Sequence, residues 1–229
     1  YNEVNNMYFN FFLFQLYPYI ALTVFIVATW IRYDRDQYSW NARSSQILSD
    51  RWFILGNNLF HWSVILILCS HFVGLLTPET LYKSIISPAH KQLMAMIVGG
   101  ALGVLCFIGM TILVLRRLFN SRVRATSRTS DIVILLAVYV QLILGLATIP
   151  FSAQHLDGVE MEALANWVQH LAILDSNSFL YLNKVGLVFK IHVLCGMTLF
   201  VLFPFTRLVH VVSVPLKYMT RTGYQIVRK

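Results

Sequence analysis

Five long apolar runs constrain what this chain can fold into. They cover, within a few residues, positions 7–31, 53–76, 92–115, 132–150 and 185–209. A helix needs about 20 residues to cross a hydrocarbon core of about 30 Å, and each run has roughly that length. Because 57% of the residues are hydrophobic and only 12% are charged, the chain has too little charge to cover a soluble domain of its size. The sequence therefore predicts an all-α membrane protein with five transmembrane helices, forming one domain over residues 1–229.

Lysine and arginine are concentrated in alternate connections between these runs. One group lies after the first run, after the third run and from position 207 onwards: Arg32, Arg35, Arg43, Arg51, Arg116, Arg117, Arg122, Arg124, Arg128, Arg207, Lys217, Arg221, Arg228 and Lys229. The other connections hold only Lys83, Lys91, Lys184 and Lys190. Since cytoplasmic loops are rich in these residues, the N-terminus is predicted outside and the C-terminus in the cytoplasm.

The net charge of +8 therefore has a topological explanation. No nucleic-acid-binding motif accompanies the basic residues, so we expect no nucleic-acid partner. The basic inner face, especially RRLFNSRVRATSR and the C-terminal tail, is where we expect a partner protein to dock. The three cysteines, Cys69, Cys106 and Cys195, lie within predicted spans without a CxxC or CxxCH motif, which excludes the usual covalent attachment of a c-type haem.

Two of the apolar runs carry histidines. The segment NNLFHWSVILILCSHF, residues 57–72, contains His61 and His71, and the fifth run contains His192 and His210. Polar side chains at membrane depth are costly and usually face an interior where they have a function. The second run crosses from inside to outside and the fifth crosses back. His71 therefore shares the outer depth with His192, and His61 shares the inner depth with His210.

Two pairs of imidazoles, one in each leaflet, are typical of two b-type haems held by axial histidines between the second and fifth helices. Zinc usually takes further Cys, His or carboxylate ligands at the same level, and these spans supply none. A proton relay in a transporter is the alternative from another class. It would favour acidic residues deep in the spans, where the sequence has none.

The two histidines of the second run and the two of the fifth run are separated by different distances along the helix axis. The step from His61 to His71 rises about 15 Å along a helix, whereas the step from His192 to His210 rises about 27 Å. We therefore expect helix tilt, a different reach of the rings, or a kink near Pro204 to bring one pair together. The remaining histidines, His90, His155 and His170, are expected in solvated outer loops.

Six blocks closely resemble one known family. They are YPYIALTVFIVATWIRYDRDQYSW, NNLFHWSVILILCSHFVGLLTP, KQLMAMIVGGALGVLC, RRLFNSRVRATS, LGLATIPFSAQHLDG and GMTLFVLFPFTRLVHVVSVP. The family is the gamma subunit, a cytochrome b, of membrane-bound respiratory nitrate reductase. The resemblance implies two b haems: a distal haem held by His71 and His192 near the outer face, and a proximal haem held by His61 and His210 near the cytoplasm.

The resemblance also implies that quinol is oxidised beside the distal haem. Lys91, in HKQLMAM, matches a lysine implicated in quinol binding, and its ammonium can hydrogen-bond a quinone oxygen. Gly74 follows His71 by three residues and would let the quinol ring approach the haem. No catalytic residue is expected beyond the haems.

The resemblance further implies the partners and the location of the chain. Electrons would pass to an iron–sulfur beta subunit and then to a molybdenum-containing alpha subunit that reduces nitrate in the cytoplasm. The chain would lie in the cytoplasmic (inner) membrane of a bacterium or archaeon, in contact with lipid and the quinol pool. An alternative with the same haems is the cytochrome b anchor of another quinone-linked oxidoreductase, such as a hydrogenase or formate dehydrogenase.

Overall fold

The computed structural model describes residues 2–36, 39–40, 48 and 50–212. In these residues the secondary structure is entirely helical, without a strand. Five helical segments are long and apolar enough to cross a membrane: Asn5–Arg35, Arg51–Leu76, Pro88–Phe119, Thr129–Ser152 and Leu187–Phe205. The prediction of an all-helical protein with five candidate spans is confirmed. The basic residues Arg43, Lys217, Arg221, Arg228 and Lys229 of the predicted docking face lie outside the described residues.

The first span is built from three consecutive pieces, and the other four spans are each dominated by one helix. The pieces of the first span are α1 (Asn2–Phe11), the π-helical turn η1 (Phe12–Leu16) and α2 (Tyr17–Arg35). The long helices of the other spans are α3 (Arg51–Leu76), α5 (Pro88–Phe119), α7 (Thr129–Ser152) and α9 (Leu187–Leu202). The shorter elements are α4 (Glu79–Tyr82), α6 (Ser121–Ala125), α8 (Val159–Ala172), η4 (Ser178–Lys184), η5 (Phe203–Phe205) and η6 (Arg207–Val211).

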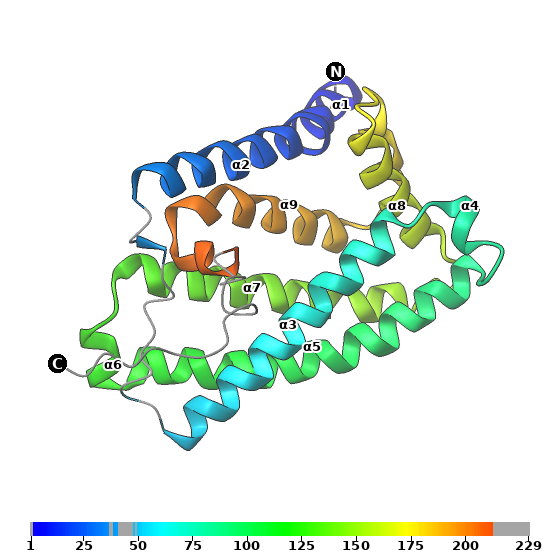
Figure 1. The fold of residues 1–229 in the computed structure, drawn as a ribbon. Helices are drawn as coiled ribbons and strands as arrows, with labels where there is room; N and C mark the ends of the chain where they lie inside the picture. The colour runs from blue at the N-terminus through cyan, green and yellow to red at the C-terminus, as the bar shows by residue number, and fades with distance from the viewer. Residues whose placement is uncertain (1, 37–38, 41–47, 49, 213–229) are drawn as a thin grey trace, which may run out of the picture.

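The long helices pack in a series. Helix α3 packs on α5, α5 on α7, α7 on α9, and α9 on α2. Helices α4 and α8 lie at one end of the bundle, which we call the α8 end, and α6 lies at the opposite end, which we call the α6 end (Figure 1). Helix α3 also contacts α8, so the second span is tied to the α8 end.

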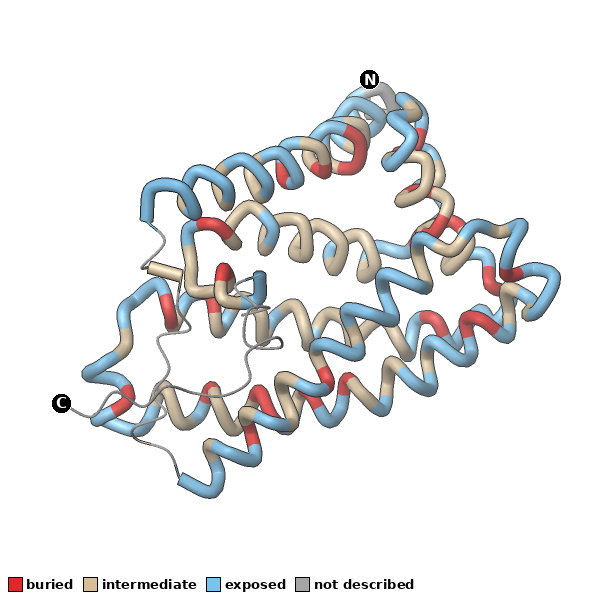
Figure 2. Tube along the Cα trace, in the orientation of Figure 1, coloured by how far each residue is buried: buried red, intermediate tan, exposed pale blue. Residues whose placement is uncertain are grey.

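The long helices expose large apolar side chains. Trp30, Trp62 and Phe72 are 74%, 70% and 69% exposed, and exposed residues run along the outer faces of the bundle in Figure 2. Such apolar surface is unfavourable in water and is covered by acyl chains in a bilayer. The exposure pattern therefore agrees with a multi-pass membrane protein.

Glycines allow α3 and α5 to approach closely. A Cβ added to Gly109 of α5 would lie 2.6 Å from the backbone nitrogen of Phe60 and 2.8 Å from the carbonyl oxygen of Gly56. Both contacts are with the backbone of α3, which cannot swing aside as a side chain can. Small residues at helix contacts are a common way of bringing membrane helices together. Since Phe60 precedes His61, this contact also sets the position of the first histidine.

Helix α9 is shorter than the sequence predicted. The fifth run was expected to continue to position 209, but the α-helix ends at Leu202 and gives way to the 3₁₀ turns η5 and η6. Pro204 has no N–H and its ring clashes with the preceding turn of a helix, which explains the break. Arg32 of α2 donates from Nη1 to the carbonyl oxygens of Pro204 at 2.7 Å and Thr206 at 2.8 Å. The broken segment is thus tied to α2.

We expect Gly109→Ala to lower the stability of the protein by about 1–3 kcal/mol, because its Cβ would push α3 and α5 apart. The midpoint of thermal unfolding in detergent measures this. Gly99→Ala is the matched control on the same helix. A Cβ added to Gly99 would have no described atom within 4 Å, apart from its chain neighbours and the backbone of its own helix. Equal midpoints for the two variants would contradict the proposed close contact.

Candidate functional site

The structure brings the four histidines of the predicted spans together as two pairs. The ring centroids of His71 on α3 and His192 on α9 lie 6.3 Å apart, with 44° between the ring planes. Those of His61 on α3 and His210 on η6 lie 6.4 Å apart, with 67° between the planes. These are the same pairs that the depth argument predicted. The break after α9 is what places His210 opposite His61.

The spacing within each pair suits one metal ion between two imidazoles. A metal-bound imidazole nitrogen lies about 2 Å from the metal and about 1 Å from the centroid of its own ring. Two rings on opposite sides of one metal therefore have centroids roughly 6 Å apart. Both observed separations agree with this value. Helix α3 packs on α5, and α9 packs on α7 and α2, so the two histidine-bearing helices are held by different neighbours.

Three of the histidines have a ring orientation set by the backbone. The Nδ1 atoms of His61 and His71 lie 2.8 Å from the carbonyl oxygens of Asn57 and Ile67, one helical turn earlier. The Nδ1 atom of His210 lies 2.5 Å from the carbonyl oxygen of Arg207. A carbonyl only accepts, so each Nδ1 carries the proton and donates it. The lone pair of each Nε2 is then available to a metal.

His192 has different surroundings. Its Nδ1 is buried and has no hydrogen-bond partner among the described residues. Its Nε2 lies 3.4 Å from the amide nitrogen of Gln141 on α7, and a Cβ on Gly145 would lie 3.0 Å from the ring. Gly145 thus makes room for the imidazole. The sequence analysis missed Gln141, although an amide side chain inside the fourth apolar run was a signal that could have identified it.

The donors around these pairs fit haem better than zinc. In the described part of the chain, no group of three or more His, Cys, Asp or Glu side chains is arranged to hold a metal ion. Each pair therefore offers two axial nitrogens and no further ligand, which is what an iron already held by a porphyrin needs. The cysteines Cys69, Cys106 and Cys195 are all free thiols.

Lys91 lies in the first turn of α5 and is 8% exposed. Its Nζ sits 3.8 Å above the centre of the Tyr82 ring and makes no hydrogen bond within the described residues. Gly74 lies almost one turn after His71 on α3, and a Cβ there would make ordinary contact, at 3.6 Å, with the Met161 methyl of α8. Both predicted quinol-site residues are therefore at the α8 end.

A buried amide fixes the chain beside Lys91. Gln92 is 2% exposed, and its Nε2 donates to the carbonyl oxygens of Ser152 at 2.9 Å and His155 at 2.8 Å. Its Oε1 accepts from the backbone N–H of Gly158 at 2.8 Å. Gly158 has a φ of +82°, and an added Cβ would lie 2.7 Å from the Pro88 carbonyl carbon. The sequence analysis treated Gln92 only as the start of a span and missed this clamp.

The prediction that His90 and His170 lie in loops was wrong. His90 is in the first turn of α5, where its Nδ1 lies 2.7 Å from the Ser87 hydroxyl. His170 is on α8, and its Nε2 lies 3.1 Å from the Tyr181 hydroxyl. The connection expected to be an outer loop is largely helical because α8 has an apolar face that packs at this end. His155 does lie between helices, after α7.

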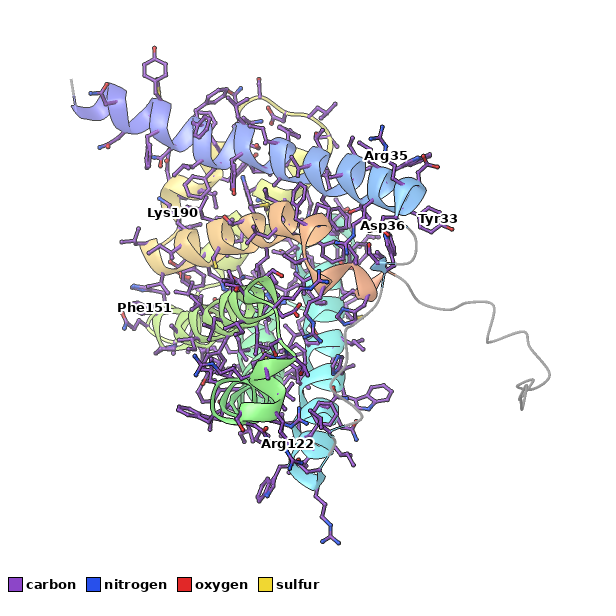
Figure 3. All side chains as sticks on the ribbon, turned by 90° about the vertical axis from the view of Figure 1, so that its left-hand side faces the viewer. Tyr33, Arg35, Asp36, Arg122, Phe151 and Lys190 are labelled. Carbon is purple, nitrogen blue, oxygen red and sulfur yellow. The ribbon has the colours of Figure 1, made fainter. Side chains whose placement is uncertain are left out.

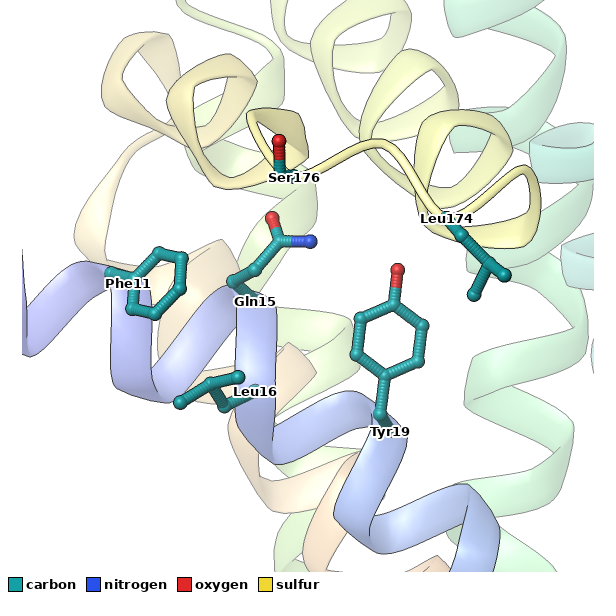
Figure 4. Close-up of a pocket in the computed structure, with 6 residues that line it drawn as sticks. All are labelled: Phe11, Gln15, Leu16, Tyr19, Leu174 and Ser176. Carbon is teal, nitrogen blue, oxygen red and sulfur yellow. The ribbon is translucent and has the colours of Figure 1, made fainter.

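A separate pocket of about 260 Å³ opens at the α8 end (Figure 4). Its lining is Phe11, Gln15, Leu16, Tyr19, Leu174 and Ser176. The Gln15 amide is already bonded, donating to the carbonyl oxygen of Asp175 at 2.8 Å and accepting from the Ser178 hydroxyl at 2.6 Å. None of the predicted site residues lines this pocket, so it is distinct from the histidine pairs.

Comparison with known proteins identifies the family. A family model described as nitrate reductase gamma subunit matches residues 10–229. The chain belongs to the nitrate reductase gamma subunit family. The respiratory nitrate reductase 2 and 1 gamma chains of Escherichia coli (strain K12) are 51% and 49% identical to it over 221 residues. Each alignment covers 96% of this chain, and 97% and 98% of the respective relatives.

The similarity extends to more distant members of the gamma subunit family. The nitrate reductase gamma chain of Bacillus subtilis (strain 168) is 37% identical over 218 residues, which cover 95% of this chain and 97% of that relative. The resemblance noted in the sequence is therefore confirmed. The chain is a membrane subunit of a respiratory nitrate reductase.

We expect Gln92→Leu to loosen the segment from residue 152 to residue 158. The change leaves two carbonyls and one N–H without their buried partner, at a cost of about 1–3 kcal/mol for each unpaired group. Hydrogen exchange at the Gly158 amide should become faster. Gln154→Leu is the control, because Gln154 is exposed in the same segment. Unchanged exchange at Gly158 in the Gln92 variant would contradict the clamp.

Proposed function

We propose that this family member is a quinol-oxidising dihaem cytochrome b, a single five-helix domain over residues 1–229. It would carry electrons from quinol at the outer face of the cytoplasmic membrane to partner subunits inside. The observation that carries the proposal is the pair of histidine separations, 6.3 and 6.4 Å, each matching two axial ligands of one haem iron.

We assign the two histidine pairs to the same two haems as in the sequence analysis. His71 and His192, toward the α8 end, would hold the distal haem, and His61 and His210 the proximal one. Each haem b supplies a one-electron carrier when bound. The chain supplies the ligands, the ring orientations set by the Nδ1 bonds, and two helices that fix the spacing between the sites. Two carriers at different depths give electrons a route across the membrane.

The orientation follows from the basic residues. Arg35 and Arg122 are exposed on the α6 end, which faces the viewer in Figure 3. The ends of α2, α3, α5 and α7 at this end, together with α6, carry further arginines: Arg32, Arg51, Arg116, Arg117, Arg124 and Arg128. The positive-inside rule makes it the cytoplasmic end and makes the α8 end the outer one. The iron–sulfur beta subunit would dock at the α6 end and pass electrons to the molybdenum-containing alpha subunit.

The quinol site is placed at the α8 end, between Lys91, Gly74 and His71. The Lys91 ammonium is buried and has donors to spare, so it can hydrogen-bond a quinol oxygen. Gly74 and His71 lie almost one turn apart on α3, so a ring beside Gly74 would be close to the distal haem. The bacterial or archaeal quinol pool in the surrounding lipid would supply the electron donor.

The first test is the haem content of the histidine variants. The wild type should show two b haems per chain in a pyridine haemochrome assay and a reduced-minus-oxidised spectrum. His71→Ala should lose the distal haem and His61→Ala the proximal haem, because each iron loses an axial ligand. His90→Ala should keep both, since its ring bonds Ser87 outside the pairs. A colourless, well-folded wild-type protein would contradict the proposal and favour the histidine relay.

The second test concerns the quinol site. Lys91→Ala should retain two haems but lose quinol oxidation by about tenfold or more, because the hydrogen bond to the quinol oxygen is lost. Stopped-flow reduction of the haems by a quinol analogue measures this. Lys190→Ala is the matched control, a half-buried lysine in the first turn of α9 at the same end. If Lys91→Ala reduces the haems at the wild-type rate, Lys91 is not part of the quinol site.

A further inference from the structure

Two carboxylates share one ammonium at the α8 end. The Nζ of Lys83, directly after α4, lies 2.6 Å from Glu79 Oε1 and 3.2 Å from Glu162 Oε1 of α8. The three side chains are 45%, 34% and 32% exposed for Lys83, Glu79 and Glu162, so water reaches all of them. With two acids and one base, the group carries a net negative charge when all three are ionised. We call these three residues the carboxylate cluster.

Stability alone is a weak explanation for the carboxylate cluster. Ion pairs this exposed contribute little to stability, and a second carboxylate adds repulsion. The side chains of Glu162 and Lys83 beside it hold the pKa of the Glu79 carboxyl below its usual range. Glu79 is therefore ionised at neutral pH, and a proton that it takes up would be released readily to water.

The carboxylate cluster adjoins the buried ammonium of Lys91. Tyr82 lies between Glu79 and Lys83 in sequence, is 7% exposed, and places its ring 3.8 Å from the Lys91 Nζ. Lys91 also acts electrostatically on Glu79. Burial, and then the charge of Glu79, raise the pKa of the Tyr82 phenol, so it keeps its proton.

Helix α8 connects the carboxylate cluster to α3. The Met161 methyl lies 3.6 Å from where a Cβ on Gly74 would be, and the next residue is Glu162. The groups facing Glu79 are therefore Lys83 and Tyr82 around α4, Glu162 from α8 and Lys91 from α5. The two carboxylates are about one-third exposed, whereas Lys91 is buried. Gly74 and His71, the other residues of the proposed quinol site, lie on α3.

Quinol oxidation requires a proton acceptor at this end. Converting one quinol to quinone breaks two O–H bonds and releases two electrons and two protons. The electrons would pass one at a time to the proposed distal haem, a one-electron acceptor that His71 and His192 would hold. A charged lysine has no lone pair, so Lys91 can bind the quinol oxygen but cannot take its proton.

We propose that Glu79 and Glu162, bridged by Lys83, accept the protons that leave quinol at Lys91 and release them to water at the α8 end. This inference rests on the proposed quinol site. Each proton moves from a quinol oxygen to a carboxylate oxygen and then to water, so the carboxylates are regenerated in every turnover. Their partial exposure is what connects the buried Lys91 to the solvent.

The test is the double variant Glu79→Gln and Glu162→Gln in the assembled, haem-loaded complex. Glutamine keeps a hydrogen-bonding side chain of the same shape but does not accept a proton. Haem reduction by a quinol analogue should slow about tenfold or more at neutral pH. The rate should then rise with pH, as hydroxide replaces the carboxylates, and should recover when millimolar acetate or imidazole is added as a small proton acceptor. The haem count should not change.

Two variants separate proton acceptance from structure. Glu79→Asp keeps a carboxylate and should keep the wild-type pH profile without a need for added buffer. Asp175→Asn removes an acid at the same end whose side chain accepts from the Asn177 N–H, and it should behave as wild type. A slow double variant with an unchanged pH profile and no recovery by buffer would overturn the proposal, as would a wild-type rate.

The failure of this inference can be distinguished from failure of the quinol site. If Lys91→Ala and His71→Ala both leave quinol oxidation intact, the proposed quinol site is wrong. The assignment of Glu79 and Glu162 as proton acceptors, which depends on that site, is then wrong as well. If those variants abolish oxidation while the double glutamine variant behaves as wild type, only the assignment of Glu79 and Glu162 is overturned.

Discussion

The placement of His210 depends on the break in α9 at Pro204. A continuous helix would put His210 about 27 Å from His192, whereas His61 and His71 on α3 are only about 15 Å apart along their helix. After Leu202 the chain turns away from the axis of α9 (Figure 1), and both ring pairs close to nearly the same separation, 6.3 and 6.4 Å. In a membrane interior, carbonyls freed by such a break need partners from the protein. Arg32 supplies them for Pro204 and Thr206.

The α8 end is held by contacts between segments that are distant in sequence. The indole of Trp167 donates to the carbonyl oxygen of Phe14 at 2.9 Å. Phe14 belongs to the π-helical turn η1, and irregular turns of this kind leave a carbonyl available to another group. Phe14 and Trp167 are part of a buried apolar cluster with Phe179 and Leu182. This cluster packs α8 and η4 against the first span. It therefore holds in place the elements at the end of the bundle where Lys91 lies.

Several buried polar side chains of this protein have a defined partner or lie beside a proposed site. The Gln92 amide is bonded to backbone groups, and the Gln15 amide is bonded to the Asp175 carbonyl oxygen and the Ser178 hydroxyl. The His192 Nδ1, the Gln141 Oε1 and the Lys91 Nζ have no hydrogen-bond partner within the described residues. Unpaired buried polar groups are costly, and they are uncommon unless a ligand or cofactor meets them. These groups lie beside the proposed distal haem and the proposed quinol site, which is consistent with both assignments.

The sequence by itself determined the five spans, the two histidine-bearing helices and the pairing of their histidines by depth. These features are set by hydropathy and helix rise, which depend on residues close together along the chain. Pro204 is a local signal for the break after α9. Tertiary structure alone decided that α8 is a helix, and that Gln92, Gln141 and the carboxylate cluster have partners. Each of those depends on contacts between residues far apart in sequence, such as Gln92 with Gly158 or Lys83 with Glu162. No local pattern encodes such contacts, because they form only when the helices pack.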